Sequence, residues 1–162
     1  MKPKDIYEEI KGIGTWFSLE DIQEFANLKL PKKLTILELG TGHGRSTKAL
    51  RLLFPDAWIT TCDPEIQCEE RFIFEYANDF APVKGHDLRW NKPLDLLFID
   101  DDHMKDTVKK DVEIYKKFIK KGGYIVFHDF YGTEVNQAVA DLGLRVTAVK
   151  TGDYSMAIWR NV

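Results

Sequence analysis

ILELGTGHGRS, residues 36–46, is the stretch of this chain that decides its fold. It starts with a short apolar run and continues with three glycines at alternate positions, Gly40, Gly42 and Gly44. An apolar run before a glycine cluster predicts a buried parallel strand and a tight turn whose backbone N–H groups can approach a ligand closely. The residues up to Pro55 then carry apolar side chains at helical spacing. The stretch therefore predicts the strand, turn and helix that begin a nucleotide-type binding fold.

The composition of the 162 residues narrows the class of protein. Apolar residues make up 44% and charged residues 30% of the chain, which is ordinary for a globular domain. A net charge of −3 leaves no basic surplus for phosphate backbones, so we expect no nucleic-acid partner. The sequence shows no secretory signal pattern and no 18-residue apolar span, and it has two cysteines, Cys62 and Cys68. We therefore expect a cytoplasmic protein, not bound to a membrane, with reduced cysteines.

Strand-like and helix-like runs alternate along the chain. The strands are expected at residues 35–39, 58–62, 94–99, 124–128, 144–150 and 155–160. The helices between them are expected at about 44–54, 67–79, 105–120 and 132–142. Such alternation is typical of βαβ units with right-handed crossovers. It predicts an α/β fold with a Rossmann-like, doubly wound, mostly parallel sheet and helices on both faces.

The end of the chain departs from this alternation. Only residues 151–154 separate the last two expected strands, which is too short for a helical crossover. The separating residues include Gly152 and Asp153, a pair typical of a hairpin turn. We therefore expect the final strand to run antiparallel in an otherwise parallel sheet.

The glycine stretch resembles the first motif of a known enzyme family. ExGxGxG at residues 38–44 is similar to the motif of class I S-adenosylmethionine (SAM)-dependent methyltransferases. The dinucleotide-binding fingerprint would require a small residue where Arg45 stands. The methyltransferases also have a terminal hairpin, so a nicotinamide dehydrogenase is disfavoured. The resemblance covers roughly residues 34–160 and implies that the cofactor is SAM.

The resemblance also implies which residues surround SAM. Those expected beside its methionine part are Glu38, Gly40, Thr41, Gly42, Gly44 and Ser46. Asp63 follows the second expected strand and would accept hydrogen bonds from the ribose hydroxyls; its alternative role is that of an acid in a strand-end turn. His86 and Asp87 fall where the family contacts the adenine edge, and Asp100 is expected near the cofactor as well.

A second pair of motifs lies in the other half of the chain. FIDDDH at residues 98–103 and GGYIVFHD at residues 122–129 resemble the FIDGDH…GGxxVFHD pattern of small-molecule O-methyltransferases. That group includes macrocin-type sugar enzymes and relatives of catechol O-methyltransferase. Asp101 departs from the pattern, which has glycine there. The resemblance implies transfer of a methyl group to a hydroxyl of a small molecule, assisted by a divalent metal ion.

Asp100 and Asp129 are the expected metal ligands, because each follows a strand and parallel strands end at one edge of a sheet. Two carboxylates can hold Mg²⁺ and leave positions for substrate oxygens. His128 is either a third ligand, which would favour Mn²⁺ over Mg²⁺, or a residue without a role in the site. His103 matches the family's general base, so Asp100 and His103 are the expected catalytic residues. The alternative for residues 100–102 is an acidic turn that caps the next helix.

We expect one domain over residues 1–162, in which a helical segment at 1–33 precedes a SAM-binding core at 34–162. The N-terminal segment offers one or two helices and no full lid. An open site completed by a second protomer, and hence a homo-oligomer, is one arrangement that would follow. The nearby Trp16 and Phe17 lie across the cofactor or pack onto the core.

Two other functions stay open at this point. One is a metal-independent methyltransferase that acts on another nucleophile, such as nitrogen. The other is a non-catalytic, SAM-binding partner subunit, with which the short N-terminal segment is compatible. The identity of the hydroxyl acceptor does not follow from the sequence, because substrate-facing loops vary without disturbing the fold.

Overall fold

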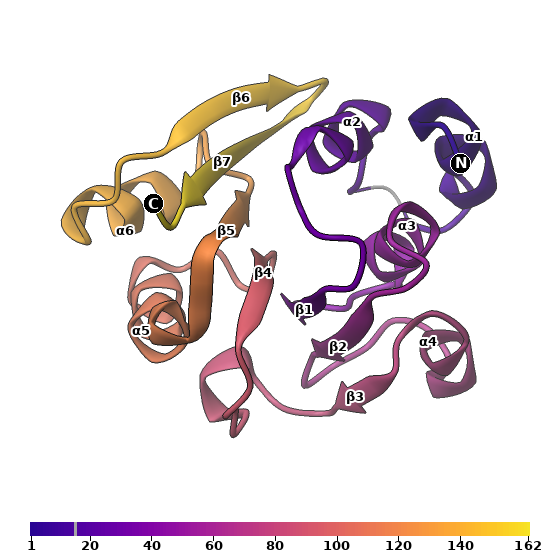
Figure 1. The fold of residues 1–162 in the computed structure, drawn as a ribbon, viewed down its shortest axis with the longest axis horizontal. Coiled ribbons are helices and arrows are strands. Elements are labelled where there is room, and N and C mark those ends of the chain that lie inside the picture. The colour runs from indigo at the N-terminus through magenta and orange to yellow at the C-terminus, as the bar shows by residue number, and fades with distance from the viewer. Residues whose placement is uncertain (15) are drawn as a thin grey trace.

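The computed structural model describes residues 1–14 and 16–162, and a seven-stranded sheet forms the centre of this part of the chain (Figure 1). The strands are β1 (Thr35–Leu39), β2 (Trp58–Cys62), β3 (Asp79–Ala81), β4 (Leu94–Ile99), β5 (Ile119–His128), β6 (Thr147–Thr151) and β7 (Tyr154–Arg160). Their order in the sheet is β3-β2-β1-β4-β5-β7-β6. β1 to β5 are parallel, whereas β7 pairs antiparallel with both β5 and β6. The predicted mostly parallel sheet with a C-terminal antiparallel hairpin is confirmed.

Helices cover both faces of the sheet. One face carries α1 (Pro3–Ile10), α2 (Leu19–Asn27), α3 (Arg45–Leu53) and α4 (Glu70–Tyr76); the other carries α5 (Lys105–Tyr115) and α6 (Val135–Asp141). Because side chains alternate along a strand, β1 contributes Ile36 to the first core and Leu37 and Leu39 to the second. Within the described ranges, no helix is both long and apolar enough to cross a membrane.

The observed elements differ from the expected ones in two places. The short edge strand β3 was not expected, because three residues are too few for a periodic pattern. The helix expected to reach residue 120 ends at Tyr115, and β5 already begins at Ile119. β5 includes Gly123, whose missing side chain matters: an added Cβ would lie 3.0 Å from the backbone oxygen of Asp95. The glycine accommodates an irregular register between β4 and β5, which no local periodicity indicates.

The ends of the central strands are held in direct contact with one another. The Gly40 backbone N–H donates to the carbonyl of Cys62, and the Asp100 N–H donates to the carbonyl of Leu39, at 2.9 and 2.8 Å. Gly40 has a φ of 96°, and a Cβ there would lie 2.1 Å from the Asp100 carbonyl oxygen. Gly40 is therefore required by the close approach of two strand ends, and it joins the loops that form the functional site.

Candidate active site

A cleft of about 470 Å³ opens where β1, β2, β4 and β5 end. Its walls come from the loops after these strands, from Lys84 and Gly85, and from the N-terminal segment around Trp16. The volume lies within the range of roughly 300–1,000 Å³ that is usual for ligand sites. The predicted residues on its walls are Gly40, Thr41, Gly42, Ser46, Asp63, Asp100, His103 and Asp129. The predicted residues that do not line it are Glu38, Gly44, His86, Asp87 and His128.

The glycine loop supplies one wall of the cleft. Gly42 has a φ of 51°, and an added Cβ there would meet no atom within 4 Å, so its lack of a side chain keeps the cleft open. The Gly42 N–H donates to Oδ2 of Asp63 at 2.8 Å, and Oδ1 of Asp63 accepts from the Glu65 N–H at 2.8 Å. These bonds fix the Asp63 carboxylate at the cleft and leave it further lone pairs for ligand hydroxyls. The wall thus fits a nucleoside-bearing cofactor such as SAM.

Glu38 lies beneath the glycine loop, although it was predicted to surround the methionine part of SAM. Its side chain is fully buried and accepts hydrogen bonds from Ser46 Oγ at 2.6 Å and Thr47 Oγ1 at 2.5 Å. Burial raises the pKa of Glu38 to about 7, against the opposing effect of these hydroxyl donors and Thr61. Glu38 therefore connects β1 to the start of α3 through hydrogen bonds and stabilises the conformation of the loop between them.

The predicted adenine-side residues His86 and Asp87 belong to the 3₁₀ turn η1 (Gly85–Asp87) and do not line the cleft, whereas Gly85 of the same turn does. Nδ1 of His86 lies 3.7 Å from Oδ1 of Asp111 on α5. A Cβ at Gly85 would lie 2.9 Å from Leu39 and 3.0 Å from Asp111. The turn is packed so tightly that its backbone, and not its two polar side chains, faces the cleft.

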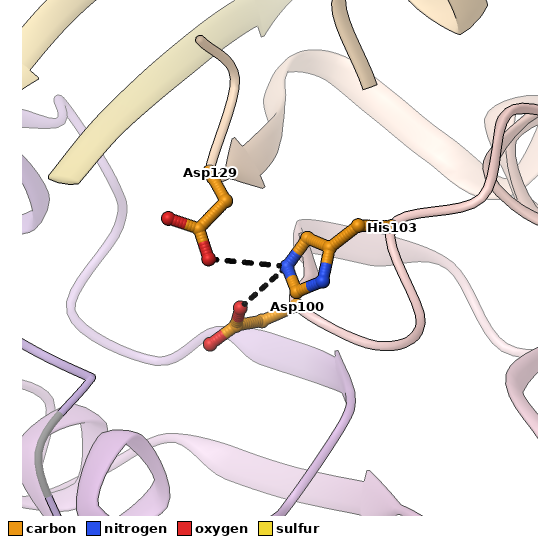
Figure 2. Close-up of side chains that lie close together, drawn as sticks. All are labelled: Asp100, His103 and Asp129. Carbon is orange, nitrogen blue, oxygen red and sulfur yellow. Dashed lines mark ion pairs between the residues drawn. The ribbon is translucent and has the colours of Figure 1, made fainter. Parts of the chain in front are cut away.

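Three side chains converge on the opposite wall, as Figure 2 shows. Nε2 of His103 lies 3.4 Å from Oδ1 of Asp100 and 3.3 Å from Oδ2 of Asp129. His103 and Asp129 have φ values of 57° and 49°, in the left-handed region that side chains other than glycine disfavour. Such backbone strain costs about 1–3 kcal/mol per residue and is concentrated at functional sites. The fold thus holds both residues in an unfavourable conformation beside Asp100.

His128 lies behind this cluster and is fully buried. Its Nδ1 is 3.2 Å from Oδ1 of Asp100 and 3.5 Å from Oδ2 of Asp129. Two imidazole nitrogens, from His103 and His128, therefore flank the same two carboxylate oxygens. Both nitrogens are buried and have no hydrogen-bond partner among the described residues. The ligand atoms of Asp100, His103 and Asp129 all lie within 4.8 Å of one another, so these three residues could hold a cation, with His128 directly behind them.

The charges of this cluster shift its pKa values in opposite directions. Burial alone would raise the pKa of Asp100, but His128 and His103 outweigh that effect and lower it. Burial alone would lower the pKa of His103, but Asp100 and Asp129 outweigh burial and raise it. The pKa of His128 is raised for the same reason, with Asp21 contributing as well. Without a cation, the cluster is thus a set of mutually stabilising opposite charges.

The sequence reasoning missed Asp21, which lies on the far side of His128. Oδ2 of Asp21 is 3.4 Å from Nε2 of His128, and both side chains are fully buried. The available signal was the spacing of Ser18 and Asp21 before an apolar run, which is typical of a capping box. That spacing indicates a helix start, and nothing in it points to a histidine more than 100 residues away.

The acidic residues next to Asp100 have separate roles. Asp102 accepts hydrogen bonds from the Met104 N–H and from Thr107 Oγ1, both at 3.1 Å, and so stabilises the turn before α5, although α5 begins after Met104 without a side-chain cap. Asp101 is directed toward Asp111, and burial raises the pKa of both; that of Asp111 rises to about 9. Asp101, which stands in place of glycine in the family pattern, thus forms a carboxyl pair beneath the cleft.

The N-terminal segment divides between the two predicted roles. Trp16 lines the cleft, has 56% of its surface exposed, and its ring lies 5.8 Å from that of His43. Phe17 is buried and packs against the rings of Phe25 and Phe98. Thr15, between Gly14 and Trp16, lies outside the described residues. Trp16 therefore borders the cleft, whereas Phe17 belongs to the core and also contributes to the lining of the cleft.

Comparisons with known proteins agree with this geometry. The model of a family described as "Methyltransferase domain" matches residues 37–130, which is more than half of the chain. An uncharacterized protein of Acanthamoeba polyphaga mimivirus is 38% identical over 63 residues, which are 38% of this chain. The chain spans only 28% of the length of that viral protein.

Solved structures share the fold at low sequence identity. A SAM-dependent O-methyltransferase from Thermotoga maritima has a TM-score of 0.71 at 13% identity, covering 97% of this chain and 71% of that one. An rRNA methylase from Streptococcus thermophilus has a TM-score of 0.66 at 12% identity, with 88% and 93% covered. A Streptococcus mutans protein in complex with SAH has a TM-score of 0.65 at 12% identity, with 88% and 95% covered. The family match shows that the chain belongs to the methyltransferase-domain family, and the solved structures show that it shares their fold.

Proposed function

We propose that this methyltransferase transfers the methyl group of SAM to a hydroxyl of a small molecule, with a divalent cation held by Asp100, His103, His128 and Asp129. The observation that carries the proposal is the convergence, beside the glycine loop, of two carboxylate oxygens and two buried imidazole nitrogens that lie 3.2–3.5 Å from them and make no hydrogen bond among the described residues. Asp100, His103 and Asp129 share the cleft with Gly42 and Asp63, so both reactants would meet in one space. Orienting two reactants in this way supplies much of the acceleration of a transfer reaction.

The donor set supports Mn²⁺ or a similar transition metal more strongly than Mg²⁺, because imidazole is a poor ligand for Mg²⁺. When bound, such a cation would lower the pKa of a hydroxyl that coordinates it. Asp100 and Asp129 would supply the negative charge that holds it. We assign His103 as a ligand in place of the predicted general base, since its Nε2 faces both carboxylates and cannot hold a cation and a proton at once.

The expected acceptor is a small molecule. The cleft measures about 470 Å³ and has to hold the cofactor together with the acceptor. A net charge of −3 disfavours a nucleic-acid backbone, and the likeness to an rRNA methylase concerns the fold. Trp16, exposed at the border of the cleft, provides an apolar surface for the acceptor. A sugar and a phenol both fit these constraints.

The test compares Asp100→Asn with Asp102→Asn, which makes the same change of charge two residues away, outside the cluster. We expect Asp100→Asn to lose turnover on a panel of sugar and phenol acceptors with Mn²⁺, yet to keep SAH binding in a thermal-shift titration. Asp102→Asn should retain both. A saturating ligand at 100 times its Kd adds about 2.7 kcal/mol of stability, so the shift is readily measured. Full turnover of the unmodified enzyme in EDTA would contradict the metal-assisted mechanism.

One observation favours a second candidate function, a metal-independent methyltransferase. The raised pKa values of His103 and His128 and the lowered pKa of Asp100 allow the cluster to balance its own charges. Under this alternative, the ion pairs only hold the loops after β4 and β5 together. It requires that EDTA leave turnover unchanged and that Mn²⁺ produce no shift in Tm.

A further inference from the structure

Arg45, the first residue of α3, is a buried cation at the border of the cleft. It has 8% of its surface exposed and lines the cleft beside Ser46. Nη1 of Arg45 donates to the carbonyl oxygen of Gly14 at 2.8 Å, and Cζ lies 5.6 Å from the centre of the Tyr7 ring. These two contacts hold the guanidinium between the N-terminal segment and the start of α3.

The protein does not satisfy this guanidinium by itself, although a guanidinium carries several N–H donors and a permanent positive charge. Within the described residues, Nη1 is the only guanidinium nitrogen with a hydrogen-bond partner, Nε is buried without one, and Arg45 forms no ion pair. The buried carboxylate beneath the start of α3, Glu38, accepts from the hydroxyls of Ser46 and Thr47 instead. A buried charge without an opposite charge is costly, so an anion bound at Arg45 would be stabilised.

The start of α3 adds to the attraction for an anion. Gly44 precedes this nine-residue helix and provides no side-chain cap. The backbone N–H groups of the first turn therefore have no capping acceptor, and the helix dipole favours negative charge at this end. Arg45 and Ser46, the first two residues of the helix, both line the cleft. The buried guanidinium and the uncapped helix end thus favour an anionic ligand group at the same part of the cleft.

The other charged residues of the cleft restrict which ligand group binds there. Its acidic lining residues are Asp63, Asp100, Asp101, Asp102 and Asp129. Among the described lining residues, the only lysine or arginine besides Arg45 is Lys84, which precedes Gly85 on the predicted adenine side. Arg45 adjoins Ser46, on the side predicted for the methionine part of SAM. SAM carries a sulfonium, an ammonium and a carboxylate, so its carboxylate is the group that requires a cation.

We propose that Arg45 binds the carboxylate in the methionine part of SAM through guanidinium N–H groups that have no partner within the protein. The inference rests on the proposed function, which supplies SAM as the cofactor, and it is independent of the metal ion. A guanidinium matches a carboxylate in shape, because two parallel N–H···O bonds can form at once. The hydrogen bond to Gly14 makes the N-terminal segment a support for this residue.

The test compares the binding of SAH with that of its decarboxylated analogue, in which a hydrogen atom replaces the carboxylate. Isothermal titration calorimetry measures the Kd of both ligands for the unmodified protein, Arg45→Met, Arg45→Lys and Lys84→Met. Lys84→Met is the matched control, because it removes the same charge from the other cation that lines the cleft. Far-ultraviolet circular dichroism checks that each variant is folded; Arg45→Lys keeps a cation at the buried position if Arg45→Met fails to fold.

We expect the unmodified protein to bind SAH about 10–100-fold more tightly than the analogue, as is typical of hydrogen bonds between charged groups. Arg45→Met should lose this preference, because SAH binds more weakly while the affinity for the analogue changes by less than about threefold. Arg45→Lys should reduce the preference by about threefold or more, since an ammonium lacks the paired donors. Lys84→Met should keep the preference of the unmodified protein to within about threefold.

Three outcomes overturn the inference alone: equal binding of both ligands by the unmodified protein, a preference for SAH that persists unchanged in the Arg45 variants, or its equal loss in Lys84→Met. The last of these would mean that the preference reflects the overall charge of the cleft. Failure of the unmodified protein to bind either ligand overturns SAM as the proposed cofactor, and this inference with it.

Discussion

Apart from Arg45, the two walls of the cleft differ in whether their polar side chains have hydrogen-bond partners within the protein. On the glycine-loop wall, polar side chains are satisfied within the protein: Ser46 bonds to Glu38, Thr41 to Thr61, and Asp63 to Gly42. On the wall formed by Asp100, His103 and Asp129, with His128 behind it, both histidines have buried nitrogens without hydrogen-bond partners among the described residues. The first wall is held by its own hydrogen bonds in a fixed shape that can receive a cofactor. The second wall is a cluster of carboxylates and imidazoles that face one another without hydrogen bonds.

Backbone conformation shows the same contrast. On the glycine-loop wall, the residues with a left-handed backbone conformation are Gly40, Gly42 and Gly44. For glycine this conformation costs little free energy. On the other wall, His103 and Asp129 have the left-handed conformation, and their backbone is strained. The comparison indicates that the wall with Asp100, His103 and Asp129 loses some stability in order to hold chemical groups in place, whereas the glycine-loop wall does not.

The substitution with the largest expected effect is one that disrupts the contact between the two walls. In Gly40→Ala, the new Cβ would lie 2.1 Å from the Asp100 carbonyl oxygen, at a φ of 96°. Overpacking and backbone strain together should lower the free energy of unfolding by at least about 3 kcal/mol. The matched change Gly42→Ala meets no atom and should cost only about 1–2 kcal/mol, yet reduce SAH binding because it fills the cleft. Urea denaturation would measure both; equal stability of the two variants would contradict this account.

The next effect concerns the buried carboxyl under the cofactor wall. The pKa of Glu38 is raised in the folded state from 4.5 to about 7, so folding favours its protonated form. The resulting stabilisation is fully present below about pH 4.5 and is lost as the pH rises through 7, a change of about 3 kcal/mol. Glu38→Gln cannot ionise and should lack this component. Subtracting its stability–pH curve from that of the unmodified protein would reveal the component, and a flat difference between pH 4.5 and 7 would refute it.

A reciprocal pair of substitutions would separate the walls functionally. Asp63→Asn should weaken SAH about tenfold, because hydrogen bonds to a charged acceptor contribute roughly 1.5–3 kcal/mol, and leave Mn²⁺ affinity unchanged. Asp129→Asn should weaken Mn²⁺ about tenfold or more and leave SAH affinity unchanged. Isothermal titration calorimetry with each ligand measures all four values. If either substitution weakened both ligands equally, the walls would not be independent.

The smallest effect is expected at the border of the cleft. Trp16 is 56% exposed, so Trp16→Ala should change the free energy of unfolding by less than about 0.5 kcal/mol. Its neighbour Phe17 is buried against Phe25 and Phe98, so Phe17→Ala should cost about 3–5 kcal/mol. Thermal unfolding of both variants measures the difference. A large loss of stability in Trp16→Ala would show that the residue belongs to the core.

Local patterns predicted the strands that are buried on both faces. Residues 35–39, 58–62 and 94–99 were expected as strands, and β1, β2 and β4 have those bounds. Each is an apolar or β-branched run that is followed by a glycine or an acid, so its C-terminal end is marked in the sequence. The beginning of β5 and the whole of β3 were missed, because irregular register and edge pairing depend on the neighbouring strand and not on local periodicity.

Local sequence patterns were enough to predict the α/β class, the glycine loop, and the meeting of Asp100 and Asp129, because parallel strands that end in acids bring them to one edge of the sheet. Only the tertiary structure decided that His103 and His128 approach the same two oxygens, that Glu38 lies under the loop, and that Asp21 stands behind His128. The physical reason is distance along the chain. A strand or a turn is indicated by the pattern of residues close together in the sequence, whereas contacts between α2, β4 and β5 depend on how separate elements pack.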